Sequence, residues 1–230
     1  MHKLKKKEIL WLASNYCKHY VTYLEHYNCF LVEVAQRAKY DPYSKQDIPI
    51  PHRIGYFDIE TSNLQANFGI VYCYCIKDSQ SDRIYQKIVN KRTLAKDLDK
   101  HVIEGCIKDL KKFDRIVTFY GARFDLPFVR TRATYWQLPF PFYKTLLHTD
   151  IYYIVRNKFR IHSNRLETAY NTLVGKSRKT HFGRDYWIRA MQGDKESLSY
   201  ILDHCRRDVL DLEELYNVIQ DFAMKRDLSI

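Results

Sequence analysis

The stretch Ile54–Thr61 constrains the fold more than any other part of the sequence. It reads Ile-Gly-Tyr-Phe-Asp-Ile-Glu-Thr and predicts a short apolar strand that ends on two carboxylates, Asp58 and Glu60. Because side chains alternate along a strand, both acids point to one face while Phe57 and Ile59 pack on the other. Two adjacent carboxylates repel each other, so a positive group is needed to keep both ionised. A hard cation such as Mg²⁺ or Mn²⁺ suits oxygen ligands, whereas an exposed edge strand would leave the two acids merely hydrated.

A regular succession of apolar segments begins near residue 53 and predicts an α/β domain. The expected elements, in order, are strands at 54–61, 68–77 and 83–88, a helix at 93–112 capped by Thr93, a strand at 115–120, a helix through about 136, a strand ending near 150, and helices thereafter. Short connections between the first three strands favour an antiparallel meander. The order as a whole is that of an RNase H-like fold, with three antiparallel strands and then parallel strands in one mixed sheet flanked by helices.

Residues 1–50 stand apart from this pattern. Three prolines between residues 41 and 51 indicate a linker, so we expect a helical N-terminal extension and linker at 1–50 before a domain at 51–230. Two cysteines and two histidines of the extension lie close together in sequence: Cys17, His19, His26 and Cys29. They could form a tetrahedral structural Zn²⁺ site, although the spacing matches no standard zinc finger and such residues on an amphipathic helix more often simply pack.

The charge balance favours a polyanionic partner. The chain has 230 residues, and 38 Lys and Arg against 27 Asp and Glu give a net charge of +11. Nucleic acid is the first candidate partner and an anionic membrane surface the second. Neither a membrane-spanning apolar run nor a signal peptide is recognisable, so we expect an intracellular, cytoplasmic protein (in the host cytoplasm if the source is viral).

Two further segments carry acids that could join Asp58 and Glu60. Asp125 follows the strand at 115–120 and stands near the first turn of a helix, where it could equally act as a capping residue. Asp208 lies in the last helix, and His204, four residues earlier, shares its face. An ordinary surface His–Asp pair would show the same spacing.

Together these blocks resemble the motifs of the DEDD exonuclease superfamily, which includes polymerase proofreading domains and RNase D. The matching blocks are Phe57–Thr61, Arg123–Phe128 and His204–Val209, with weaker support from His148–Asp150, Asn164–Leu166 and Leu173–Gly175. The resemblance spans roughly residues 53–222 and looks most like the stand-alone branch found in bacteria and phages. It implies a metal-dependent 3′→5′ exonuclease that hydrolyses phosphodiester bonds of single-stranded DNA or RNA from a 3′ end.

The resemblance also implies roles for individual residues. Asp58, Glu60, Asp125 and Asp208 would hold two Mg²⁺ or Mn²⁺ ions. Substrate contacts would come from Thr61, Ser62, Asn63, Leu64 and Arg123. One position departs from the family pattern, because His204 occupies the spacing of the tyrosine branch with the residue of the histidine branch. We expect His204 to orient or deprotonate the attacking water.

A basic segment follows the predicted strand near residue 150. Its basic residues are Arg156, Lys158, Arg160, Arg165, Lys176, Arg178, Lys179 and Arg184, against the single acid Glu167. Tyr170, His181 and Phe182 lie among them and could stack on bases, so the segment could track a single strand, unless it is only a solvated basic face. Asp150 could support the site or cap the following helix, and capping is favoured.

Two other functions remain open at this point. The same fold could carry an endonuclease, because fold does not fix function. A non-catalytic nucleic-acid-binding protein is the other alternative, although the presence of all four carboxylates speaks against it.

Overall fold

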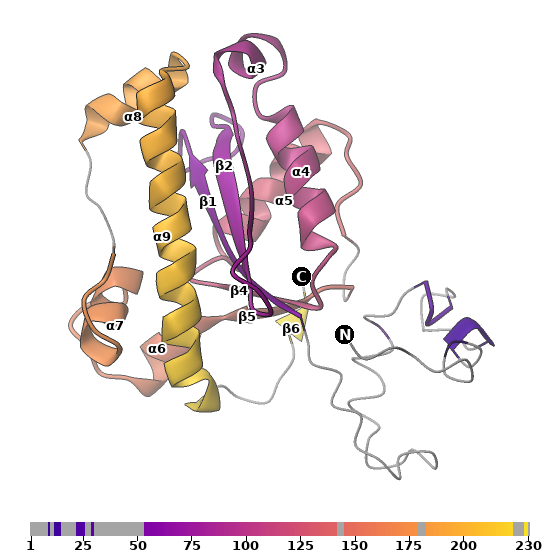
Figure 1. The fold of residues 1–230 in the computed structure, drawn as a ribbon, viewed down its shortest axis with the longest axis vertical. Coiled ribbons are helices and arrows are strands. Elements are labelled where there is room, and N and C mark those ends of the chain that lie inside the picture. The colour runs from indigo at the N-terminus through magenta and orange to yellow at the C-terminus, as the bar shows by residue number, and fades with distance from the viewer. Residues whose placement is uncertain are drawn as a thin grey trace.

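In a computed structural model of the chain, the described residues are 53–141, 145–178, 183–222 and 228–229, with short pieces of the N-terminal segment (9, 12–14, 22–25 and 29). They contain a six-stranded mixed sheet in the order β3-β2-β1-β4-β5-β6 (Figure 1). Its strands are β1 (Ile54–Thr61), β2 (Val71–Asp78), β3 (Ile84–Ile88), β4 (Arg115–Thr118), β5 (Leu147–Asp150) and β6 (Leu228–Ser229). The first three strands pair antiparallel, whereas β4 and β5 continue the sheet parallel to β1, as predicted. The short β6, which pairs antiparallel with β5, was not expected.

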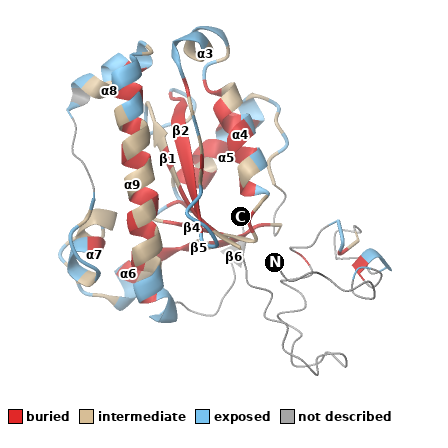
Figure 2. Ribbon diagram, viewed as in Figure 1, coloured by how far each residue is buried: buried red, intermediate tan, exposed pale blue. Residues whose placement is uncertain are grey.

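Helices cover both faces of this sheet. The helices are α3 (Lys91–Lys96), α4 (Lys100–Leu110), α5 (Asp125–Tyr135), α6 (Ile151–Lys158), α7 (Leu166–Leu173), α8 (Arg184–Met191), α9 (Lys195–Ile219) and the 3₁₀ turn η1 (Gln220–Phe222). The long α9 crosses one face of β1 and β2, and α4 and α5 lie on the other (Figure 1). Every residue of β2 is buried, as expected for a strand covered on both faces (Figure 2). None of the helices in the described ranges is long and apolar enough to cross a membrane.

The strand β1 extends beyond its parallel partner. It pairs with β4 only from Ile54 to Tyr56, whereas its pairing with β2 continues as far as Thr61. The second half of β1 therefore has an open edge on the β4 side. Because a strand edge presents backbone N–H and C=O groups without a ladder partner, that edge is available to a side chain from elsewhere in the fold.

The helix expected at 93–112 is two helices, α3 and α4, and this part of the prediction was wrong. The chain turns at Leu98, which has a left-handed φ of 50°, and Asn90 rather than Thr93 is the N-cap of α3. The cause lies in the neighbouring Asp99, which is fully buried. Its carboxylate accepts hydrogen bonds from the Val71 backbone at 3.0 Å and from the Arg132 guanidinium at 2.7 and 2.9 Å. Those partners are remote in sequence, so helical periodicity alone cannot reveal the break.

Candidate active site

The first predicted carboxylates lie on the face of β1 that is turned toward α9. The Tyr56 ring packs edge-on against Tyr216 of α9 at a centroid distance of 5.8 Å, whereas Phe57 is buried on the opposite side of the strand. Because alternate residues of a strand share a face, Asp58 and Glu60 follow Tyr56 on the α9 side. Both acidic residues are half-buried, so neither belongs to a fully exposed edge strand.

Helix α9 brings the next two predicted residues to Glu60. The His204 Nδ1 atom lies 3.5 Å from Glu60 Oε1 and 3.6 Å from Asp208 Oδ1. One potential ligand atom from each of these three residues lies within 4.8 Å of the others, a spacing that could hold a metal ion. His204 and Asp208 are only 8% and 7% exposed, which excludes the ordinary surface pair considered from sequence. Two carboxylates and an imidazole are a donor set that suits a divalent cation.

Asp125 reaches the same region from the N-terminus of α5. Its Oδ1 accepts a hydrogen bond from the Ile59 backbone N–H at 3.2 Å, on the open edge of β1 between the two motif acids. Phe124 is the N-cap of α5, so the Asp125 side chain is bound to the sheet and does more than cap a helix. Burial raises the pKa of Asp125 to about 7, and the charges of Asp150 and Asp208 act in the same direction. A cation would relieve that accumulation of negative charge, so the site fits one.

Asp150 fixes the turn that leads from β4 into α5. Its Oδ1 accepts the N–H groups of Tyr120 at 2.8 Å and Tyr152 at 3.1 Å, and its Oδ2 accepts that of Ala122 at 3.0 Å. The bond to Tyr152 is the predicted cap of α6, whereas the other two had no signal in the sequence. Within this turn Tyr120 has a left-handed φ of 68°, and a Cβ at Gly121 would collide with the side chain of the last β4 residue. Asp150 therefore acts as both a helix cap and an anchor for the start of α5.

Three buried cysteine side chains pack next to Asp58 and Glu60, between the sheet and α9. In the β1–β2 register Cys75 pairs with Asp58 and Cys73 with Glu60, and the thiol of Cys205 in α9 donates to the Asp58 carbonyl at 3.4 Å. All three cysteines are fully buried. Burial raises the pKa of Cys73 to about 11, so the thiol stays neutral and serves packing. Compact side chains here allow α9 to approach the sheet closely enough for its polar residues to reach β1.

The predicted substrate-contacting residues after β1 form a hydrogen-bonded loop. The Thr61 hydroxyl donates to the Asn63 carbonyl at 2.8 Å, and the Ser62 hydroxyl accepts from the Ile70 N–H at 3.0 Å. Thr61, Ser62 and Asn63 thus shape the loop, and Leu64 projects from it with 78% of its surface exposed. Arg123 lies in the β4–α5 turn, where a hydrogen bond to the Tyr153 hydroxyl raises the pKa of its guanidinium.

The possible zinc site is largely outside the described residues. Cys17, His19 and His26 all fall there, so their arrangement is not described. Cys29 is described, and its side chain is buried.

Comparisons with known proteins agree with this architecture. The family model of the RNase H superfamily matches residues 55–220. Among solved structures, the family B DNA polymerase from the hyperthermophilic archaeon Pyrobaculum calidifontis is similar, with a TM-score of 0.59 and 23% sequence identity. That alignment covers 75% of this chain and 25% of the polymerase, so the chain spans about a quarter of the polymerase's length. No curated protein matches the sequence. The expected RNase H-like fold is confirmed, and because the family model covers most of its length, the chain belongs to the RNase H superfamily.

Proposed function

We propose that this protein is a metal-dependent 3′→5′ exonuclease of the DEDD type, acting on single-stranded DNA or RNA. Membership of the RNase H superfamily supports a nuclease activity in general. The finer proposal is carried by the convergence of Glu60, His204 and Asp208 within 4.8 Å, beside Asp58 and Asp125. Residues 51–230 would form the nuclease domain, and 1–50 its N-terminal extension.

Four carboxylates would hold the metal ions, namely Asp58, Glu60, Asp125 and Asp208. They reach the site from a strand and two helices, so the folded domain supplies the ligands that isolated segments could not. When bound, two Mg²⁺ or Mn²⁺ ions would stabilise the negative charge that develops on the phosphodiester during in-line attack by water. The raised pKa of Asp125 supports this arrangement, because the cluster needs positive charge to stay ionised near neutral pH.

His204 would accept the proton of the attacking water. Its Nδ1 lies 3.5 Å from Glu60 and 3.6 Å from Asp208, so the imidazole stands directly beside the proposed metal ligands. The neighbouring carboxylates would then stabilise the imidazolium that forms. Loss of a general base costs roughly 10²- to 10⁴-fold in rate, so His204→Ala should lower kcat by that order while folding is retained. A variant whose turnover stays within a factor of about two of wild type would show that His204 has another role.

The basic segment provides a surface for the phosphate backbone, with two corrections to the sequence prediction. Arg178 is held by Asp211 at 2.7 Å and by Glu214 at 2.6 Å. Tyr170 is 4% exposed and donates its hydroxyl to Glu214, so it cannot stack on a base. Apart from Arg178, the exposed basic residues of the segment are Arg156, Lys158, Arg160, Arg165 and Lys176. The side chains of Lys179, His181, Phe182 and Arg184 lie outside the described part of the chain.

Digestion of 5′-labelled single-stranded DNA and RNA with Mg²⁺ or Mn²⁺ tests the proposal. We expect a descending ladder of products that disappears with EDTA and in Asp58→Ala. Internal cuts in a strand with a blocked 3′ end would instead indicate an endonuclease. Binding without cleavage of either strand would indicate a non-catalytic nucleic-acid-binding protein.

A further inference from the structure

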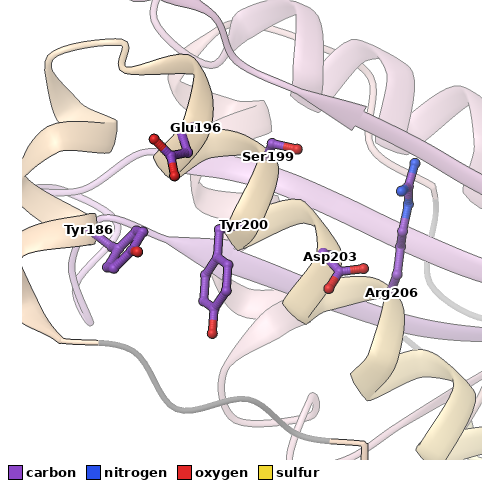
Figure 3. A pocket seen from close by; sticks show the side chains of 6 residues that line it. All are labelled: Tyr186, Glu196, Ser199, Tyr200, Asp203 and Arg206. Atoms are coloured by element: carbon purple, nitrogen blue, oxygen red, sulfur yellow. The ribbon is translucent and has the colours of Figure 1, made fainter.

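The two helices that carry proposed ligands are held in place in different ways. Helix α9, which carries His204 and Asp208, is 25 residues long, and α8 packs against it. Figure 3 shows part of that contact at a pocket between the two helices, where the rings of Tyr186 and Tyr200 stack with their centroids 5.1 Å apart. Helix α5, which carries Asp125, is only 11 residues long. Because so short a helix depends on its tertiary contacts, individual anchoring contacts decide where Asp125 lies.

Helix α5 is anchored by charged side chains at both ends. At its N-terminus, Asp125 accepts a hydrogen bond from the Ile59 N–H of β1 at 3.2 Å. At the other end, Arg132 donates to the Asp99 carboxylate from Nε at 2.9 Å and from Nη2 at 2.7 Å. The indole N–H of Trp136 donates to the same carboxylate at 2.8 Å. Asp125 and Arg132 are seven residues apart, so they share one face of the helix and lie two turns, about 10 Å, from each other.

Asp99 connects the second anchor of α5 to strand β2. Its Oδ2 accepts the Val71 backbone N–H at 3.0 Å. Strand β3 pairs with β2 as far as Cys73, so Asp99 takes the place of a strand partner for Val71. On the other side of β2, Val71 pairs with Thr61, the residue that follows Glu60. The two anchors of α5 therefore flank Glu60: one binds the residue before it, and the other binds the strand partner of the residue after it.

The sheet is irregular at the same place. The β1–β2 register shifts between Glu60 and Thr61, which leaves Tyr72 as an extra residue on β2. Such a β-bulge interrupts the ladder locally, and bulges next to active sites change the direction of a side chain. Val71 directly precedes the extra residue, so the hydrogen bond to Asp99 supports β2 where its ladder is interrupted.

The backbone around Asp99 is arranged for these partners. Asp99 is the N-cap residue of α4, where an aspartate usually accepts a hydrogen bond from the first turn, yet its side chain makes no such bond. Its two oxygens instead accept the four N–H groups of Val71, Arg132 and Trp136, which is about as many as a carboxylate can accept. The preceding Leu98 has a left-handed φ of 50°, which a large side chain rarely adopts. Backbone strain of this kind persists where surrounding contacts require it.

We propose that Asp99 is a positioning residue for the metal site, which fixes the C-terminal end of α5 to β2 and so holds Asp125 against β1. Asp99 and Arg132 are both buried, and a buried network whose hydrogen bonds are all satisfied is rigid. A rigid anchor at one end of α5 restricts the movement of the other end. This inference rests on the metal-dependent function proposed above and adds to its four carboxylates a residue outside the motifs that suggested it.

A double variant separates positioning from stability. Asp99→Asn alone leaves the Arg132 guanidinium buried without its counter-ion, which destabilises the protein. In Asp99→Asn/Arg132→Met no charge is left unpaired, and replacing a buried ion pair by uncharged side chains of similar volume is often close to neutral for stability. The double variant should therefore be more stable than the single one, although it lacks both hydrogen bonds from Arg132. If the ion pair were purely structural, metal binding would recover together with stability.

Binding of Mn²⁺ alone, without nucleic acid, is the first measurement. Residues that orient metal ligands contribute roughly 10- to 100-fold to metal affinity, so the double variant should raise the Kd for Mn²⁺ by about 10-fold or more. The matched control is Asp78→Asn, which removes the carboxylate of another buried ion pair, with Arg53 at 2.8 Å, at the opposite end of β2. It should lower stability and keep the Kd within a factor of about two of wild type. If wild type binds Mn²⁺ and the double variant binds it equally well, the inference is wrong.

Hydrogen exchange in EDTA, followed by NMR, tests the positioning without metal or cleavage. The reporter is the Ile59 amide, whose N–H is held by Asp125. Its exchange should be roughly 3- to 10-fold faster in the double variant and unchanged in Asp78→Asn. An unchanged rate in the double variant would overturn the inference, even in a protein that cleaves. Faster exchange in a protein that neither binds Mn²⁺ nor cleaves nucleic acid would retain Asp99 as the residue that positions Asp125 and reject the proposed nuclease.

Discussion

Replacing Asp150 with asparagine tests whether this residue anchors the β4–α5 turn in addition to capping α6. Asparagine and aspartate are almost equally good N-caps, so a residue that only caps a helix should tolerate the change at a cost of a few tenths of a kcal/mol. The structure indicates that Asp150→Asn lowers the free energy of unfolding by more than this. The asparagine side chain could keep one oxygen for Tyr120 and Tyr152, but its amide NH₂ would replace the oxygen that accepts from Ala122.

The magnitude follows from these three hydrogen bonds. Asp150 is 8% exposed, so the Ala122 N–H would lose its acceptor in a nearly dry environment, which costs about 1–3 kcal/mol. The two remaining bonds would change from charge-assisted to neutral, which weakens each by roughly half. We therefore expect Asp150→Asn to lower the free energy of unfolding by about 2–4 kcal/mol. It should also lower kcat, because the turn it releases positions Asp125.

Urea denaturation of the purified protein, followed by circular dichroism, measures this change. The matched control is Asn90→Ala, which removes an exposed N-cap from α3 and should cost about 1 kcal/mol without affecting cleavage. A change of less than about 0.5 kcal/mol in Asp150→Asn would refute the anchoring role, because that is the result for a simple cap.

Three further predictions concern other parts of the molecule. Asp99→Asn leaves the buried Arg132 guanidinium without its counter-ion and should lower the free energy of unfolding, measured by urea denaturation, by about 3–5 kcal/mol. A decrease of less than about 1 kcal/mol would contradict a stabilising role for the ion pair. Burial lowers the pKa of His148 to about 4 from 6.5, so the unfolded chain takes up a proton first as pH falls. Relative to His148→Gln, wild type should therefore lose about 2–3 kcal/mol of unfolding free energy between pH 7 and pH 4.5. If the unfolding free energies of the two proteins changed in parallel with pH, the lowered pKa of His148 would be excluded. In salt titrations of single-strand binding, Arg160→Gln should reduce the slope of log K against log salt by about 0.7. Arg178→Gln should leave the slope unchanged, because Asp211 and Glu214 already bind Arg178. Equal slopes for wild type and Arg160→Gln would show that Arg160 does not contact the phosphate backbone.

The sequence was sufficient for the main architecture because local patterns determine it. In strand β1 side chains alternate between the two faces, so burying Phe57 on one face places the two acids together on the other. The pairing of His204 with Asp208 follows from helical spacing alone. The order of the motifs suggested that His204 and Asp208 lie near Glu60. Only the folded structure shows how close they come.

What the sequence could not supply depends on partners that are remote along the chain. The helix break at Leu98 follows from Asp99 binding Val71 and Arg132. Similarly, Arg178 reads as a free cation until α9 is placed beside it. The Tyr186–Tyr200 pair joins two helices, so no spacing within one helix indicates it. In each case the deciding contact is tertiary, and periodicity carries no information on it.

The most direct test of the proposed metal-dependent nuclease activity is a Mn²⁺ titration in which metal binding and single-strand cleavage are followed on the same preparations. Wild type should bind Mn²⁺ and gain activity over the same concentration range, and Glu60→Gln and Asp208→Asn should lose both together. Circular dichroism should confirm that each variant is folded. Cleavage that persists without metal, or in Asp208→Asn at wild-type rate, would contradict the assignment of this cluster as the catalytic metal site.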